Sequence, residues 1–398
     1  MAGPDSPLPE ELLNRRPPIW LAAYTVVLVI WLVGLYLPLF FSAFPHPIDS
    51  LDFSNYYAAA RIGLEHGWSR IYDLGLQQQV FYQLHPANDV FDWRRYFVSP
   101  PPVAWLVAPL TLLPLVPAFW TFAGLSAVAF GAAGWLAVPG RGIGRVALFL
   151  TAACVFPVLI AIQTGQVTPL IAAATVLAWW LARRGHQVLA GLVLVLLVLK
   201  PQVAILVPAA MLIAGQRRLF VTWLAGAGAI TLVSVASLGG QGLEQLRADL
   251  SLEQGQAANL AWTLAGLFGS GPMALGLGLV CGGIALLVAW WHRRRGLELV
   301  MVAGILGTLL AAPYHNPSDF AILAPAAWLY LRSGVRVWHH AWLVVGLLAT
   351  YLAAGFGPGL LLVFTLGWLG LLVADTQTRQ PADDASVAGR VELAGVRQ

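Results

Sequence analysis

The stretch WLAAYTVVLVIWLVGLYLPLFF, residues 20–41, decides the fold because it contains no charged side chain and is long enough to cross a membrane. About 20 apolar residues suffice to span the hydrocarbon core of a bilayer. Runs of this kind recur along the chain, which is 59% hydrophobic and only 10% charged, with a mean hydropathy of +0.75. Signal peptides occur once, at the N-terminus. We therefore expect an all-α, polytopic membrane protein, which excludes the soluble and nucleic-acid-binding classes.

Arginines between the apolar runs predict the orientation, because positively charged loops stay in the cytoplasm. Arg15 and Arg16 precede the first run, and arginine pairs recur at several later turns. The sequence thus predicts about twelve crossings, near residues 20–41, 115–137, 146–162, 166–182, 187–199, 201–214, 219–238, 272–291, 298–312, 319–331, 340–355 and 360–374. The predicted organisation is a cytoplasmic tail (1–19), a membrane domain (20–374) with external segments 42–99 and 239–271, and a disordered cytoplasmic tail (375–398).

Some predicted spans are too short to cross a bilayer alone. Segments 187–199, 201–214 and 319–331 would need a water-filled cavity or a thinner bilayer at one end. The stretch 100–114 is interrupted by five prolines, and it can be either a re-entrant segment or a further short span.

The acidic residues are distributed unevenly, and this limits where a catalytic carboxylate can lie. The first external loop contains six acids, among them Asp49 and Asp52, and none follows between Arg94 and Leu243. Glu244, Asp249 and Glu253 then lie in the second external segment. A carboxylate that acts as a base is therefore expected on the external side.

Residues 52–66 of the first external loop predict an amphipathic helix. Apolar residues recur at spacings of three and four, whereas Asn55, Arg61 and Glu65 fall on a more polar side. A second helical piece is expected at 73–84. Such helices are typical of lids and anchors at a membrane surface, so the alternative to a catalytic role is that the polar residues merely face water.

Other polar residues occur where apolar ones are expected. Lys200 separates two short apolar segments, and an ammonium group near hydrocarbon is more often functional than not, although a lysine can also snorkel to the interface. Two further external turns, IQTGQVTP (162–169) and APYHNPSDF (312–320), contain Gln166, Tyr314, His315 and Asn316. We expect these turns, Lys200 and the acidic loop to line one cavity.

Signatures of bound cofactors are missing from the sequence. There is no P-loop and no GxGxxG fingerprint, so neither ATP nor a dinucleotide is expected. Cys154 and Cys281 lie in apolar runs, where a thiol behaves as a small hydrophobe. We expect no cofactor, no metal and no disulfide.

The order of the motifs resembles glycosyltransferase family 87, a group within the GT-C superfamily. The resemblance covers roughly residues 20–330 and is carried by LDFSNYYAAARIGLEHGWSRIYD (51–73), YFVSPPPVAWLVAPLTLLP (96–114) and GQVTPLIAAATVLAWWLARRGHQVLAGLVLVLLVLKPQ (165–202). It departs from the family pattern in AAPYHNPSDFAIL (311–323), where a Ser-Pro turn followed by Trp and His is expected, and in ANLAWTLAGLFG (258–269), which lacks an Asn-Gln-Ser.

The resemblance implies an inverting transferase in the inner (plasma) membrane with its active site on the external, periplasmic side. It implies a polyprenyl-phosphate sugar donor, often of mannose, although pentose donors remain open, and a lipid-linked or glycan acceptor. By that likeness Asp52 is the catalytic base and Lys200 a ligand of the carrier phosphate. It further implies that His315 contacts the donor or its phosphate and that Asn259 contacts the acceptor.

Inversion needs a single carboxylate that takes the proton of the attacking hydroxyl, and cations that stabilise the leaving phosphate. Asp49 competes with Asp52 for the role of base, and Asp52 can alternatively cap its helix. Lys200, His315 and Arg61 are the predicted phosphate ligands. The other predicted substrate contacts are Asp49, Tyr56, Gln166, Asn259, Tyr314 and Asn316.

Two other classes of protein use similar features. A transporter or flippase for a lipid-linked sugar also needs a polar cavity and a cation near a lipid phosphate, although transporters often show internal repeats and charges at mid-membrane. A catalytically silent scaffold would tolerate replacement of the loop acids. Detection of covalent sugar transfer separates the transferase from both.

Overall fold

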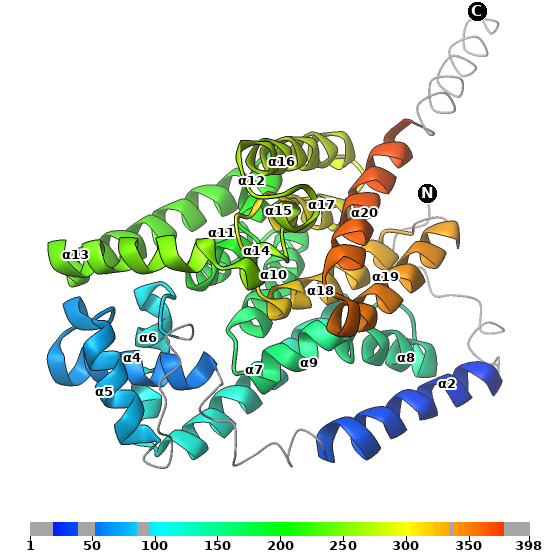
Figure 1. Cartoon of the computed structure of the whole chain (residues 1–398). Coiled ribbons are helices and arrows are strands. Elements are labelled where there is room, and N and C mark those ends of the chain that lie inside the picture. The colour runs from blue at the N-terminus through cyan, green and yellow to red at the C-terminus, as the bar shows by residue number, and fades with distance from the viewer. Residues whose placement is uncertain (1–18, 39–51, 86–95, 335–336, 378–398) are drawn as a thin grey trace, which may run out of the picture.

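The computed structural model describes residues 19–38, 52–85, 96–334 and 337–377, and every regular element in these ranges is a helix (Figure 1). The predicted all-α class is confirmed. The elements are α2 (Ile19–Ile30), η1 (Trp31–Tyr36), α4 (Asp52–His66), η3 (Trp68–Arg70), α5 (Leu74–Leu84), α6 (Pro101–Val107), η4 (Ala108–Leu112), α7 (Leu115–Ala137), α8 (Gly142–Ala153), α9 (Phe156–Gln163), α10 (Thr168–Arg183), α11 (Gln187–Leu194), η5 (Val195–Leu199), η6 (Pro201–Val203), α12 (Leu206–Ile213), α13 (Arg217–Gly255), α14 (Ala257–Leu260), α15 (Leu264–Phe268), α16 (Pro272–His292), α17 (Leu297–Ala311), η7 (Pro317–Ile322), α18 (Leu323–Arg332), α19 (Val337–Phe356) and α20 (Gly359–Gln377).

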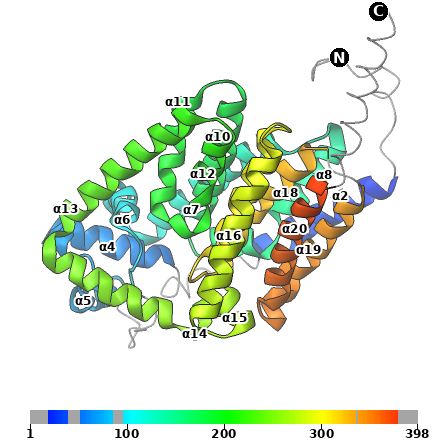
Figure 2. The ribbon, with the colours of Figure 1, turned by 90° about the horizontal axis from the view of Figure 1, so that it is seen from above.

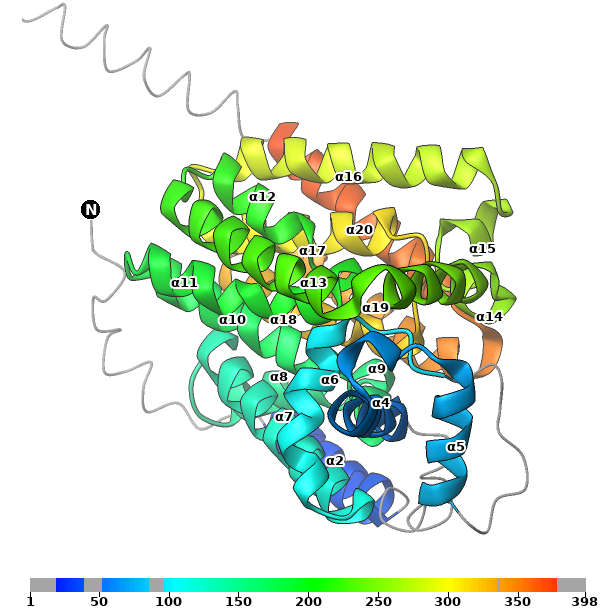
Figure 3. The ribbon, with the colours of Figure 1, turned by 90° about the vertical axis from the view of Figure 1, so that its left-hand side faces the viewer.

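Helix α17 forms the centre of the bundle. Every residue from Glu298 to Leu310 is buried, which fits a helix that is apolar on all sides. It packs against α12, α16, α18 and α20, and Figure 3 shows it between α12, α16 and α20. The other helices are arranged around this core.

The apolar helices indicate a membrane protein, but the twelve predicted crossings are not confirmed. Within the described residues, three helices are long and apolar enough to span a membrane alone, namely α7, α13 and α16. Helices α8 and α9 would make a fourth span if taken together, although they meet at a bend of 65°. Large apolar side chains on α2, α13 and α16 are exposed, as expected for surfaces that face lipid.

Several helices end inside the body of the protein. Helices α9, α11 and α12 have 8 residues each, so each is roughly 12 Å long, well below the roughly 30 Å of a hydrocarbon core. The three segments that the sequence marks as too short correspond to α11 with η5, η6 with α12, and η7 with α18. Their ends bring irregular, polar turns into the interior.

Helix α4 has the predicted bounds, 52–66, but it is not the surface helix that its amphipathic pattern suggests. Nine of its 15 residues are buried, because it packs on α5, α6, α7 and the two 3-10 helices η3 and η4. Leu64, which follows Tyr57 and Ala60 at the apolar spacing, is instead 58% exposed. Alanines 58 to 60 allow this close packing on several sides, which the hydrophobic spacing alone does not reveal. The second predicted helix is α5, and Asp73 caps it by accepting a hydrogen bond from the Leu76 N–H.

Helix α13 reverses direction within its length. Gly239 has non-helical dihedral angles (φ 60°, ψ −171°), and Figure 2 shows the two arms of α13 as a V that opens toward α14 and α16. The sequence places the end of a span at 238 and an external segment after it, which agrees with the position of the kink. The second arm returns over α4 and α6 (Figure 3).

The turn between α9 and α10 fixes the start of α4. The Phe53 N–H donates to the Thr164 carbonyl oxygen over 3.1 Å. Gly165 in this turn has φ +69°, and a Cβ there would lie 2.6 Å from the Cβ of Phe53. Replacement of Gly165 must therefore move α4 as well as strain the turn.

We expect Gly165→Ala to lower the apparent melting temperature of the detergent-solubilised protein more than Gly185→Ala. Both glycines have a positive φ, which costs about 1–2 kcal/mol for alanine, but the Cβ at Gly185 meets nothing within 4 Å. The difference between the two variants therefore measures the contacts with Phe53 and with Phe119, whose Cε2 would lie 3.2 Å from the new Cβ. Equal melting temperatures would show that α4 does not depend on this turn.

Candidate active site

The interior turns and the start of α4 surround one polar cavity of about 560 Å³. The second arm of α13 and the segment after it close the cavity on another side. Its polar or aromatic lining residues include Asp52, Asn55, Tyr56, Gln166, Lys200, Gln202, Glu253, Gln256, Asn259, Trp262, Tyr314 and Asn316. The predicted meeting of three distant turns with the acidic loop is therefore what the structure shows.

Gln166 connects two groups of opposite charge in this cavity, the Lys200 ammonium and the Asp52 carboxylate. Its Oε1 accepts hydrogen bonds from the Lys200 ammonium and the Tyr56 hydroxyl, each over 2.9 Å. An ammonium group only donates, so the oxygen of the amide must face it and the Nε2 group must point the other way. Nε2 donates to Asp52 Oδ2 over 2.5 Å. The amide thus orients the Asp52 carboxylate, which lines the cavity.

Tyr56 supports this arrangement as a neutral donor. Its side chain is buried, and burial together with the nearby Asp52 carboxylate raises the pKa of the Tyr56 phenol well above its usual range. The hydroxyl therefore keeps its proton and donates a hydrogen bond to Gln166 Oε1. Tyr56 was predicted to contact substrate, and it lines the cavity while also holding the amide.

Lys200 also forms a buried ion pair with Asp319. The Lys200 Nζ and Asp319 Oδ1 are 2.5 Å apart, and the side chains are only 8% and 0% exposed. Asp319 Oδ2 accepts from the Asn316 N–H over 3.1 Å and lies 3.2 Å from His315 Nδ1. A buried charge of this kind is tolerated only when it is paired and hydrogen-bonded.

His315 packs behind Asp319. Its Nε2 lies 2.9 Å from the Leu309 carbonyl oxygen and its Nδ1 lies 3.2 Å from Asp319 Oδ2. The imidazole thus fixes the position of the carboxylate that pairs with Lys200.

Two of the predicted contacts, His315 and Arg61, do not line the cavity. His315 is fully buried behind Asp319 and reaches the cavity only through it. Arg61 donates to Glu65 on the outer side of α4 through a pair spaced by four residues, so its predicted contact with the donor phosphate has no geometric basis. Asp49 lies outside the described residues.

Four further residues line the cavity although no sequence pattern predicts a role for them: Glu253, Gln256, Trp262 and Gln202. The scarcity of acids marks Glu253 as unusual, but its distance in sequence from Asp52 hides their proximity. Among the described residues no three His, Cys, Asp or Glu side chains are grouped in a way that could hold a metal ion.

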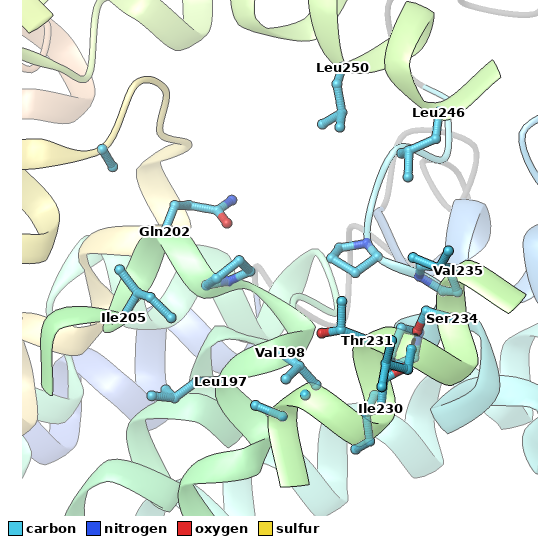
Figure 4. Close-up of a pocket in the computed structure, with 18 of the residues that line it drawn as sticks. Leu197, Val198, Gln202, Ile205, Ile230, Thr231, Ser234, Val235, Leu246 and Leu250 are labelled. Carbon is cyan, nitrogen blue, oxygen red and sulfur yellow. Dashed lines mark hydrogen bonds between the residues drawn. The ribbon is translucent and has the colours of Figure 1, made fainter. Parts of the chain in front are cut away.

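An apolar groove of about 960 Å³ opens into the polar cavity. The two share Val98, Pro100, Gln202 and Tyr314. Figure 4 shows Leu246 and Leu250 on one wall and Ile230, Thr231, Ser234 and Val235 on another, so the groove lies between the two arms of α13. Leu197, Val198 and Ile205 of the neighbouring segments lie at its base. Burial raises the pKa of Tyr314 at the junction to about 12, so its hydroxyl is protonated.

Comparisons with known proteins agree with the resemblance drawn from the motifs. The model of glycosyltransferase family 87 matches residues 97–313, which is more than half of the chain. Neither curated proteins nor solved structures gave a match.

We expect Asp319→Asn to destabilise the protein strongly, because it leaves the Lys200 ammonium buried without its anion. Removal of one partner from a buried ion pair typically costs about 3–5 kcal/mol. The double variant Lys200→Met with Asp319→Asn should recover part of this loss, since no uncompensated charge remains. Thermal unfolding of the purified proteins tests both; a double variant that is less stable than Asp319→Asn would contradict the assignment.

Proposed function

Because the chain belongs to glycosyltransferase family 87, we propose that this membrane glycosyltransferase transfers a sugar from a polyprenyl-phosphate donor to a lipid-linked or glycan acceptor. Mannose is the first candidate for the sugar, which would make the protein a hexosyltransferase. The observation that carries the proposal is the apolar groove that adjoins a polar cavity, in which the Asp52 carboxylate is oriented by Gln166 and the Lys200 ammonium is buried.

The groove suits the hydrocarbon part of such a donor. Its walls are made mostly of Leu, Ile, Val, Ala and Pro side chains, which favour a polyprenyl chain over a nucleotide. A lipid whose chain lies in the groove would bring its phosphate to the junction with the cavity. Gln202 and Tyr314 lie at this junction and can donate hydrogen bonds to it.

The cluster of Lys200, Asp319 and His315 suits the phosphate. The Lys200 ammonium is the part of this cluster that lines the cavity, because the side chains of Asp319 and His315 are fully buried. Preorganised cations stabilise the negative charge that develops on a leaving phosphate. His315 would thus act through Asp319 rather than touch the phosphate.

Asp52 suits the base. In the proposed reaction the acceptor oxygen bonds to the anomeric carbon while the bond from that carbon to the phosphate oxygen breaks, and the phosphate departs with the electron pair. Asp52 takes the proton of the acceptor hydroxyl. Gln166 keeps the carboxylate in place for this step. Asp49, the alternative base, lies outside the described residues.

The arginine-rich turns support an external active site. Helix α10 runs for 16 residues from the cavity to Arg183, so the Arg183–Arg184 pair lies roughly 24 Å away from it along the helix. If these arginines are cytoplasmic, the cavity faces the periplasmic side of the inner membrane. We place residues 20–374 in one membrane domain, with tails 1–19 and 375–398 in the cytoplasm.

We expect Asp52→Asn to reduce sugar transfer by about 10²–10⁴-fold, the usual contribution of a general base. The assay supplies purified protein with undecaprenyl-phosphate [¹⁴C]mannose and a crude lipid-glycan extract, and the product is identified by its mass. Glu65→Gln is the matched control, because Glu65 lies on the same helix and pairs with Arg61 outside the cavity.

Unchanged transfer by Asp52→Asn would remove Asp52 from the mechanism. If the wild-type protein forms no covalent product with any polyprenyl-phosphate sugar but moves the lipid across a liposome membrane, the protein is a flippase. If it does neither, the scaffold alternative gains support.

We expect Leu250→Trp to raise the KM for undecaprenyl-phosphate mannose several-fold, because the larger ring fills the groove where Leu250 points into it (Figure 4). The KM for geranyl-phosphate mannose should change less, since its short chain needs less of the groove. Leu252→Trp is the control, as Leu252 is 60% exposed on the same arm. Equal effects on both donors would place the lipid elsewhere.

A further inference from the structure

The polar wall of the cavity beyond the groove comes from one short segment. Glu253, Gln256, Asn259 and Trp262 follow one another at intervals of three residues, from the end of α13 through α14 to the turn after it. All four line the cavity, and none lines the groove. We call these four residues the polar bracket.

Glu253 is held in this bracket by neutral donors. The Asn259 Nδ2 group donates to Glu253 Oε1 and the Gln256 Nε2 group donates to Glu253 Oε2, each over 2.8 Å. Among the described residues Glu253 forms no salt bridge. Each carboxylate oxygen has about two acceptor positions, so one on each remains after the amide bond. The carboxylate is thus oriented, yet it can still accept hydrogen bonds from a ligand.

The bracket is anchored to the rest of the site. Asn259 is buried, and its carbonyl oxygen accepts a hydrogen bond from the His315 N–H. The Trp262 ring packs against Phe320 with 5.7 Å between the ring centroids, while its half-buried side chain also lines the cavity. An aromatic side chain of this kind offers a rigid apolar surface beside polar groups.

These features together match the chemistry of a pyranose ring. Sugar hydroxyls donate to carboxylates and exchange hydrogen bonds with amides, and the C–H face of the ring packs on an aromatic surface. We propose that the polar bracket is a sugar-binding subsite in which the Glu253 carboxylate accepts hydrogen bonds from pyranose hydroxyls. This inference rests on the proposed function and adds to it the residues that select the sugar.

The subsite could hold the transferred sugar or the acceptor sugar, and the experiment has one arm for each. In the donor arm, undecaprenyl-phosphate mannose is compared with its monodeoxy analogues; in the acceptor arm, octyl α-mannoside is compared with its monodeoxy analogues. In one arm we expect wild-type kcat/KM to fall about tenfold or more when the contacted hydroxyl is removed, because a hydrogen bond to a charged group is lost.

Glu253→Gln should lower kcat/KM for the complete sugar about tenfold and should reduce the discrimination against that deoxy analogue by a similar factor. This variant keeps the size of the side chain, and Gln256 can turn its amide to preserve the bracket. Glu244→Gln is the matched control, because Glu244 is an exposed carboxylate on the same arm of α13. The melting temperatures of both variants are measured alongside, since a merely structural role would change stability and leave the deoxy discrimination intact.

A change confined to the donor arm assigns the subsite to the transferred sugar, and a change confined to the acceptor arm assigns it to the acceptor. Discrimination that Glu253→Gln leaves intact in both arms overturns the inference while the proposed function stands. If the wild-type protein transfers nothing, the proposed function fails, and saturation-transfer NMR with octyl α-mannoside decides the subsite alone. Equal saturation transfer to octyl α-mannoside from the wild-type protein and from Glu253→Gln would then overturn the proposed subsite.

Discussion

The buried ion pair between Lys200 and Asp319 is the constraint on which the rest of the site depends. An ammonium group inside an apolar bundle is stable only beside an anion with its remaining hydrogen bonds made. Asp319 supplies that anion, and its own second oxygen is held by His315 and the Asn316 N–H. The helices on either side must stop short so that these groups can meet. The helix breaks beside Lys200 and Asp319 allow this pair to form.

The sequence is a good guide to which residues meet, because polar side chains in so apolar a chain have few places to go. The position of Lys200 beside Gln166 and the approach of the turn at Asn316 follow from this scarcity, whereas the bounds of α4 follow from its helical spacing. The sequence is a poor guide to how deeply a helix is buried. The pattern of α4 indicates one buried side, whereas its small alanines let several neighbours pack closely around it. Arg61 could not be excluded from the cavity either, because its pairing with Glu65 depends on which side of α4 faces outward.

The reversal of α13 at Gly239 separates two chemical environments. Mainly apolar residues before the kink and Leu243, Leu246 and Leu250 after it line the groove, whereas Glu253, at the end of the second arm, lines the cavity. A straight helix of the same sequence would carry Glu253 far from Asp52. No local pattern distinguishes a glycine that reverses a helix from the many glycines that membrane helices tolerate. The sequence therefore predicts the end of the span at 238 but not that the second arm of α13 turns back toward the cavity.

The amide of Gln166 has a consequence for the order of events at the site. One oxygen of this amide is shared by Lys200 and Tyr56, and its nitrogen fixes Asp52. An anion that draws the ammonium toward itself weakens one of the two hydrogen bonds to the amide oxygen, and the Tyr56 hydroxyl then holds the amide, and with it the Asp52 carboxylate. Such a link is reciprocal, because Lys200 and Asp52 favour the same orientation of the amide. Anion binding at Lys200 and the orientation of the Asp52 carboxylate are thus thermodynamically coupled through the Gln166 side chain, without any movement of the helices.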